Sequence, residues 1–176
     1  MFLFVSMPIL AQDTKKEAET VKTKMDVFAS KTGTIMKFVD YNLSGIKGSY
    51  GTSTETRIRK ITSGTVSGYF FQIEKAGQYG SSKASIDYND LLELIKALKT
   101  LKTEVDIDIT TSPDYLENKF TTVDWFQVGY FINKGKATWY LKLEKYGSDS
   151  SVFIQNSDLI LVAFEEGKAK IEQLKQ

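Results

Sequence analysis

The sequence contains no cysteine and no histidine, and only two prolines among its 176 residues. Without cysteine there is no disulfide and no thiolate nucleophile, and without histidine there is no imidazole base and no Ser-His-Asp triad. The same two absences remove the usual ligands of zinc. We therefore expect a non-enzymatic protein with no catalytic residues, no metal site and no cofactor.

The charges are nearly balanced, with 23 Lys and Arg against 22 Asp and Glu, for a net charge of +1. A chain with this balance lacks the broad positive field that draws proteins to nucleic acids. Nucleic acid is therefore not the partner that the composition favours. With 41% apolar and 26% charged residues, the sequence is typical of one compact globular unit.

The N-terminus is an apolar run of about ten residues that ends at Ile9, Leu10 and Ala11 and gives way to Gln12 and Asp13. This pattern resembles the apolar region and cleavage site of a secretory signal peptide. The run is too short for a transmembrane helix, which needs roughly 20 residues. It predicts a signal peptide over residues 1–11, no transmembrane segment, and an extracytoplasmic protein, periplasmic or secreted. The alternative is a buried N-terminal strand.

An internal repeat with a period near 70 residues is visible in two places. Residues 69–75, YFFQIEK, align with residues 139–145, WYLKLEK, and residues 86–92 align with residues 154–160. Alternating patterns predict strands before each aligned segment, and the spacing of the leucines from Leu91 to Leu101 predicts an amphipathic helix. We therefore expect an α+β fold of two ββββα repeats, each an antiparallel sheet, with the helices packed on one side.

The expected boundaries follow from turn residues and from the change of hydrophobic period. The first repeat spans residues 33–103, with a helix whose N-cap is Asp87 or Asn89 after strands at 34–41, 56–62, 65–75 and 83–86. The second spans residues 104–176, with a helix at about 158–175 after strands at 104–110, 123–133, 136–145 and 151–154. Segment 12–32 comes first and contains an amphipathic helix over about residues 14–30.

This tandem unit of four strands and a helix resembles the PUR repeat and Whirly-type proteins over about residues 33–175. The resemblance lies in the order of elements and carries over no individual residue. In those families the exposed face of a curved antiparallel sheet binds single-stranded nucleic acid. The resemblance therefore implies an alternative function, single-stranded nucleic-acid binding by a chain that is not exported.

Two hairpin turns, Ser63-Gly64 and Lys134-Gly135, divide the strands into faces. In the first hairpin we expect Ile58 opposite Tyr69, and in the second Tyr130 opposite Trp139. The reverse faces collect aromatic and cationic side chains, which are typical anchors for a protein or glycan partner. The candidate partner surface comprises Arg57, Arg59, Phe70, Trp125 and Tyr140. The alternative is that these aromatics are covered by the helix at 14–30 or by the other sheet.

Glu104, Asp106 and Asp108 alternate with apolar residues, so on the expected strand 104–110 they share one face. Oxygen ligands of this kind bind Ca²⁺, but a strand spaces them about 6.5–7 Å apart, which favours a solvated face. A carboxylate-dependent hydrolase is the second alternative function. The leading interpretation is an exported, non-enzymatic binding or interaction module.

The signal-peptide interpretation predicts that the mature protein begins at Gln12. Mass spectrometry of the protein from its native host should find this N-terminus. Peptides covering residues 2–10 in that material would show that the segment is retained.

Overall fold

The computed structural model describes residues 22–78, 80–146 and 149–176. Its elements are, in chain order, α1 (Lys24–Ala29), β1 (Met36–Leu43), the 3₁₀ turn η1 (Ser49–Gly51), β2 (Thr54–Ser63), β3 (Val66–Gly77), β4 (Gly80–Asp87), α2 (Tyr88–Thr110), β5 (Tyr115–Thr121), β6 (Gln127–Asn133), β7 (Lys136–Lys142), β8 (Ser151–Ile154) and α3 (Ser157–Lys175).

The strands form two antiparallel sheets, and each sheet keeps the order of the sequence. The first sheet is β1-β2-β3-β4 and the second sheet is β5-β6-β7-β8. The expected α+β fold with two ββββ units is therefore confirmed. The predicted signal peptide and residues 14–21 of the predicted N-terminal helix lie outside the described residues. No helix in the described part of the chain is both long and apolar enough to cross a membrane.

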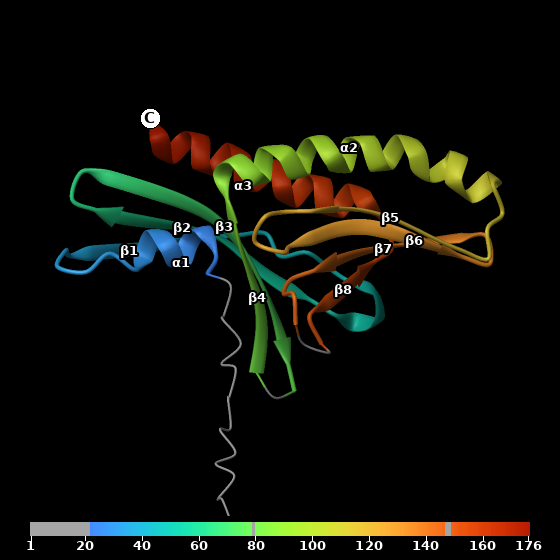
Figure 1. Cartoon of the computed structure of the whole chain (residues 1–176), viewed down its shortest axis with the longest axis horizontal. Helices are drawn as coiled ribbons and strands as arrows, with labels where there is room; N and C mark the ends of the chain where they lie inside the picture. The colour runs from blue at the N-terminus through green and yellow to red at the C-terminus, as the bar shows by residue number, and fades with distance from the viewer. Residues whose placement is uncertain (1–21, 79, 147–148) are drawn as a thin grey trace, which may run out of the picture.

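Each long helix packs against the sheet of the other repeat (Figure 1). Helix α2 follows the first sheet but extends over β5, β6 and β7, where its Asp108 accepts a hydrogen bond from the Tyr130 hydroxyl at 2.5 Å. Helix α3 follows the second sheet but lies on β2 and β3, where the Tyr69 hydroxyl donates to the Leu174 carbonyl at 3.0 Å. The two repeats are therefore interlocked.

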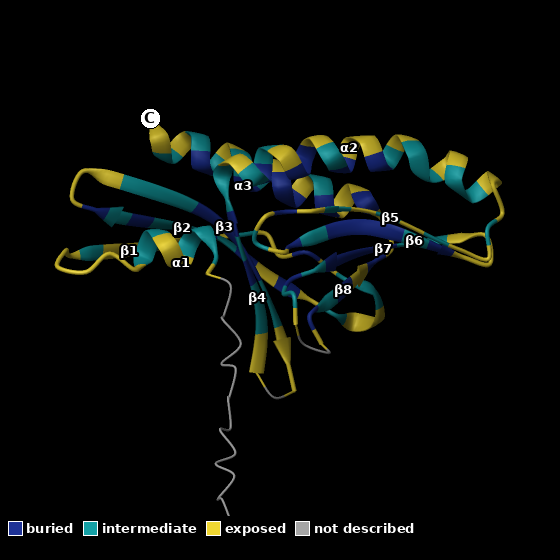
Figure 2. Cartoon of the chain, in the orientation of Figure 1, coloured by how far each residue is buried: buried dark blue, intermediate teal, exposed yellow. Residues whose placement is uncertain are grey.

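One hydrophobic core joins both sheets and both long helices. Figure 2 shows the buried residues on the sides of the sheets and helices that face each other. At the centre is Phe164 of α3, whose ring lies 5.8 Å from that of Phe71 on β3 and 6.2 Å from that of Phe126 before β6. Helix α2 contributes the leucine stripe that its spacing predicted, with Leu91, Leu94, Ile95, Leu98 and Leu101 all buried.

The two hairpins show how far turn residues determine register. The second forms as expected, with Tyr130 opposite Trp139 and left-handed φ angles at Lys134 and Gly135. In the first, Gly64 takes the first turn position with φ of +59°, so Ile58 lies opposite Phe71 and not opposite Tyr69. The expected pairing was wrong by two residues. Because side chains alternate with a period of two, this shift leaves every residue on its expected face.

The largest error in the expected fold concerns residues 104–110, which are helical. They form the end of α2, which runs to Thr110 and therefore crosses the expected repeat boundary at residues 103 and 104. Val105 and Ile109 continue the stripe of Leu101 at helical spacing and pack against the core. The apolar residues between 104 and 110 also alternate with the period of a strand, so the sequence pattern fits both structures. Contacts with the second sheet stabilise the helix.

The first strand of the second repeat is β5, which follows the loop at Ser112, Pro113 and Asp114. The expected strand at 123–133 is shorter than predicted, because residues 122–126 make a turn before β6 begins at Gln127. In this turn the Trp125 amide donates to the Thr122 carbonyl at 3.0 Å.

Gly167 in the middle of α3 is required by packing. A Cβ atom at this position would lie 2.6 Å from Cδ2 of the Phe71 ring, which is fully buried. The glycine lowers helix propensity by about 1 kcal/mol relative to alanine, but it lets α3 approach the first sheet closely.

We expect Gly167→Ala to destabilise the protein by about 1–3 kcal/mol, because the added methyl group overpacks the core. Chemical denaturation of both proteins measures this difference. In a Phe71→Leu background the same substitution should cost less, since the ring is gone. A higher stability of Gly167→Ala in the natural background would contradict this packing account.

Candidate functional site

The outer faces of the two sheets are the sides opposite α2 and α3. Their side chains alternate with the core residues along each strand. The outer face of the first sheet carries Arg57, Arg59, Phe70, Gln72 and Glu74, and that of the second sheet carries Phe131, Tyr140 and Lys142. The candidate residues therefore divide between two surfaces.

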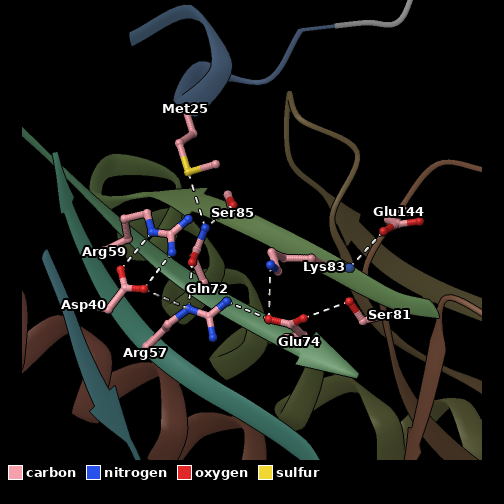
Figure 3. Close-up of polar contacts among 10 residues, drawn as sticks. All are labelled: Met25, Asp40, Arg57, Arg59, Gln72, Glu74, Ser81, Lys83, Ser85 and Glu144. Atoms are coloured by element: carbon pink, nitrogen blue, oxygen red, sulfur yellow. Dashed lines mark hydrogen bonds and ion pairs between the residues drawn. The ribbon is translucent and has the colours of Figure 1, made fainter. Parts of the chain in front are cut away.

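On the first sheet, both arginines are held by carboxylates (Figure 3). Arg59 donates from Nε and Nη2 to the two oxygens of Asp40, at 2.8 and 2.6 Å. Arg57 donates from Nη2 to Glu74 at 2.6 Å and from Nε to the Gln72 amide oxygen at 2.9 Å. The guanidinium groups thus already have strong anionic partners, which reduces their capacity to bind an external anion.

Glu74 is the centre of this polar network. It accepts hydrogen bonds from Ser81 at 2.7 Å and from Arg57, and Lys83 Nζ lies 3.1 Å away. These interactions, with the Ser81 hydrogen bond largest, lower the pKa of Glu74 to about 2. The side chain is therefore a permanent anion at neutral pH and ties β2 to β4 across β3.

Helix α1 lies on the outer face of the first sheet, next to this network. The Phe28 ring packs edge-on against the Phe70 ring at 6.2 Å, and Met25 Sδ accepts from the Gln72 amide at 3.3 Å. Lys24 fixes the helix at its start, because its Nζ pairs with Asp90 at 2.6 Å and its backbone amide donates to Asp124 at 2.9 Å. Phe70 is consequently buried.

The outer face of the second sheet holds a cluster of aromatic rings. Phe131 lies at its centre, with ring centroids of Tyr115, Tyr140 and Phe153 at 6.3, 6.4 and 6.3 Å. Tyr140 is only 6% exposed, whereas Phe153 is 40% and Tyr115 62% exposed. Gly129 lies opposite Tyr140 and has no side chain to compete for the space that the Tyr140 ring needs.

Polar groups surround these rings and line a shallow cavity of about 270 Å³. The Tyr140 hydroxyl donates to Glu117 at 2.6 Å, and Lys119 Nζ pairs with the same carboxylate at 3.0 Å. The Lys142 ammonium has no hydrogen-bond or ion-pair partner among the described residues, although its charge acts on Glu117. Gln127 also lines this cavity. The lining of this cavity therefore combines aromatic rings with one unpaired cation.

The ionisation of this surface is fixed near neutral pH. Burial, reinforced by the hydrogen bond to Glu117, raises the pKa of the Tyr140 hydroxyl. Burial also pushes the pKa of Glu117 upward, but hydrogen bonds from Tyr140 and Lys119 outweigh it and leave that pKa below its ordinary value. Tyr140 therefore stays protonated and Glu117 stays ionised.

Trp125 lies apart from both outer faces, in the turn between β5 and β6. Its backbone φ is +70°, a conformation that costs a bulky residue roughly 1–2 kcal/mol. The ring is 38% exposed, and Lys145 Nζ lies 3.7 Å from its centroid. The neighbouring Asp124 accepts the hydrogen bond from the start of α1, so this turn serves to anchor α1.

The structure thus groups the candidate residues differently from the expected single surface. Arg57, Arg59 and Phe70 lie together on the first sheet, Tyr140 lies on the second, and Trp125 belongs to a turn. Sequence reasoning missed Tyr115, Glu117, Lys119 and Phe153 as members of a surface. The first three lie on β5, which was not recognised, and only its alternating pattern after Pro113 could have revealed them.

The three acids expected on a strand face are on α2 instead. Glu104 and Asp108, one helical turn apart, accept hydrogen bonds from Asn118 at 2.7 Å and Tyr130 at 2.5 Å. They link α2 to the second sheet, and burial together with the Asp108 bond raises the pKa of Tyr130 to about 12. Within the described ranges, no group of three or more acidic side chains is arranged to hold a metal ion.

The lowered pKa of Glu74 predicts an acid-dependent loss of stability. Since the folded protein holds this pKa below that of the unfolded chain, its stabilisation is complete above about pH 4.5 and is lost as pH falls toward 2. Glu74→Gln should therefore lower the free energy of unfolding by about 1–3 kcal/mol at pH 7. Denaturant titrations from pH 7 to 2 should show the two proteins converging.

The matched control is Glu93→Gln, since Glu93 lies on the exposed side of α2 and its ion-pair contact is with Lys96 at 3.6 Å. This substitution should be nearly neutral at every pH. An equal stability difference between wild type and Glu74→Gln at pH 7 and at pH 2 would show that the carboxylate charge is not what stabilises the network.

Comparison with protein families, with curated proteins and with solved structures finds no match for this chain. Its function is therefore inferred from the geometry of its own residues.

Proposed function

We propose that this chain is a non-enzymatic binding module that holds a partner on the outer face of the second sheet. The observation that carries this proposal is the aromatic cluster there, in which three rings surround Phe131. Two of those rings reach the surface, with Tyr115 62% and Phe153 40% exposed. Contiguous exposed aromatic groups rimmed by polar side chains are typical of interaction surfaces.

The polar groups at the rim support binding rather than catalysis. A general acid or base works best when its pKa lies near the operating pH. At this surface the pKa of Glu117 is lowered and that of Tyr140 is raised, so both are shifted away from neutrality. They provide a fixed hydrogen-bonded pair that holds the Tyr140 ring in place beside Phe131.

The distribution of cations favours a protein or glycan partner over nucleic acid. Arg57 and Arg59, the only two arginines, are engaged by Glu74 and Asp40 on the first sheet. The outer face of the second sheet offers Lys119, Lys136 and Lys142, and of these Lys119 is paired with Glu117. A surface with two unpaired cations among its described residues offers fewer phosphate contacts than the roughly six to ten that a typical nucleic-acid-binding protein makes.

We place this module outside the cytoplasm. The apolar run before Gln12 supports export, and a chain without cysteine needs no disulfide formation after export. Its stability comes instead from the single core that the two repeats share.

The proposal predicts that Phe153→Ala and Tyr115→Ala weaken partner binding by about tenfold or more. The melting temperature should change little, because both rings lie at the exposed edge of the cluster rather than in the core. The measurement uses immobilised arrays of oligosaccharides, amphipathic peptides and single-stranded oligonucleotides, probed with the wild-type protein and with each variant.

The control is Phe38→Ala, which removes a ring that is 51% exposed on the outer face of the first sheet. It should bind every probe as the wild type does. If the wild type retains no probe, or if Phe38→Ala loses as much affinity as Phe153→Ala, the second sheet is not the binding surface.

A further inference from the structure

The two outer faces are equivalent positions of one repeat, but among the described residues a helix covers only the first. The hairpin turns Gly64-Thr65 and Lys134-Gly135 lie 70 residues apart, and the pairings of β2 with β3 and of β6 with β7 match at that same offset. Phe70 is therefore equivalent to Tyr140, and Gln72 is equivalent to Lys142.

Helix α1 occupies the first of these equivalent positions. Its Phe28 packs on Phe70 and its Met25 contacts Gln72. These contacts come from residues three apart on one side of a short helix, which is the spacing of an amphipathic segment. The first repeat thus shows what kind of element this part of the sheet accepts.

The second repeat has no such segment of its own. Residues 22–35 precede β1, but only residues 111–114 separate the end of α2 from β5. Tyr140 and Lys142 line an open cavity on the second sheet. Their equivalents on the first sheet, Phe70 and Gln72, are covered by α1. The exposed rings of Tyr115 and Phe153 stand beside it.

We propose that the outer face of the second sheet binds a short, acidic amphipathic helix of another protein, in the position that α1 takes on the first sheet. This inference rests on the proposed function and names its partner class. Two apolar side chains three residues apart would contact the rings of Phe131 and Phe153. Acidic residues would pair with Lys142, which stands where the first sheet has the neutral Gln72, and with Lys119.

Charge argues against a second copy of α1 as the occupant. The segment from residue 22 to residue 31 carries Lys22, Lys24 and Lys31 against Asp26 alone. On the first sheet, Lys24 pairs with Asp90 at 2.6 Å. Among the described residues on the outer face of the second sheet, the unpaired charges are the cations of Lys136 and Lys142, so a basic helix would be repelled.

The test titrates three synthetic peptides into the isotope-labelled full-length chain and follows backbone amide chemical shifts. The acidic peptide is residues 22–31 with Lys22→Glu, Lys24→Glu and Lys31→Glu. The second has the natural sequence of residues 22–31, and the third is the acidic peptide with Met25→Ser and Phe28→Ser. The acidic peptide should shift the amides of Phe131, Lys142 and Phe153 and bind on the order of threefold or more tightly than either control.

A charge reversal on the protein sharpens the test. The Lys142→Glu variant should still give the spectrum of a folded protein, and it should bind the natural, basic peptide more tightly than the acidic one. The proposal is overturned if the acidic peptide leaves these amides unshifted, if the natural peptide binds the wild type more tightly, or if the shifts appear at Phe70 and Gln72 on the first sheet instead. If the arrays show that Phe153→Ala loses an oligosaccharide while no peptide shifts this face, the binding module stands and the helical partner does not.

Discussion

The rest of the fold depends on the packing of the Phe164 ring. This ring packs between Phe71 of the first sheet and Phe126 just before β6 of the second, so one side chain of α3 joins both sheets in the core. Gly167, one turn further along, lets the helix lie close enough for this contact. Because α2 and α3 lie on one side of both sheets, they leave the outer faces of the sheets uncovered.

The two outer faces differ in how far this chain's own residues cover and neutralise them. On the first, Arg57, Arg59, Asp40 and Glu74 neutralise one another and α1 covers Phe70. On the second, the aromatic cluster around Phe131 is open at its edge. A partly buried ion-pair network and a covering helix complete the first surface internally. The second keeps apolar area and the charge of Lys142 available to another molecule.

Local patterns predicted much of the architecture, and long-range contacts account for what they missed. The Lys134-Gly135 turn predicted the second hairpin, because a two-residue turn of this kind needs positive φ angles, which both residues adopt. Residues 104–110 fit both a strand and a helix, and the bonds of Glu104 and Asp108 to the second sheet decided between them. The strand faces on which Arg57, Phe70 and Tyr140 lie were predicted correctly. The burial of Phe70 depends on α1, which no local pattern locates on the first sheet.

Hydroxyl-radical footprinting at low protein concentration tests most directly whether one outer face is closed by the chain itself while the other is open. Phe70 and Phe153 are chemically identical reporters, one beneath α1 and one at the edge of the aromatic cluster. The structure predicts that Phe153 and Tyr115 are oxidised several times faster than Phe70, at about the same rates over the concentration range. Phe153 protected to the same degree as Phe70 in the dilute protein would contradict an open second face.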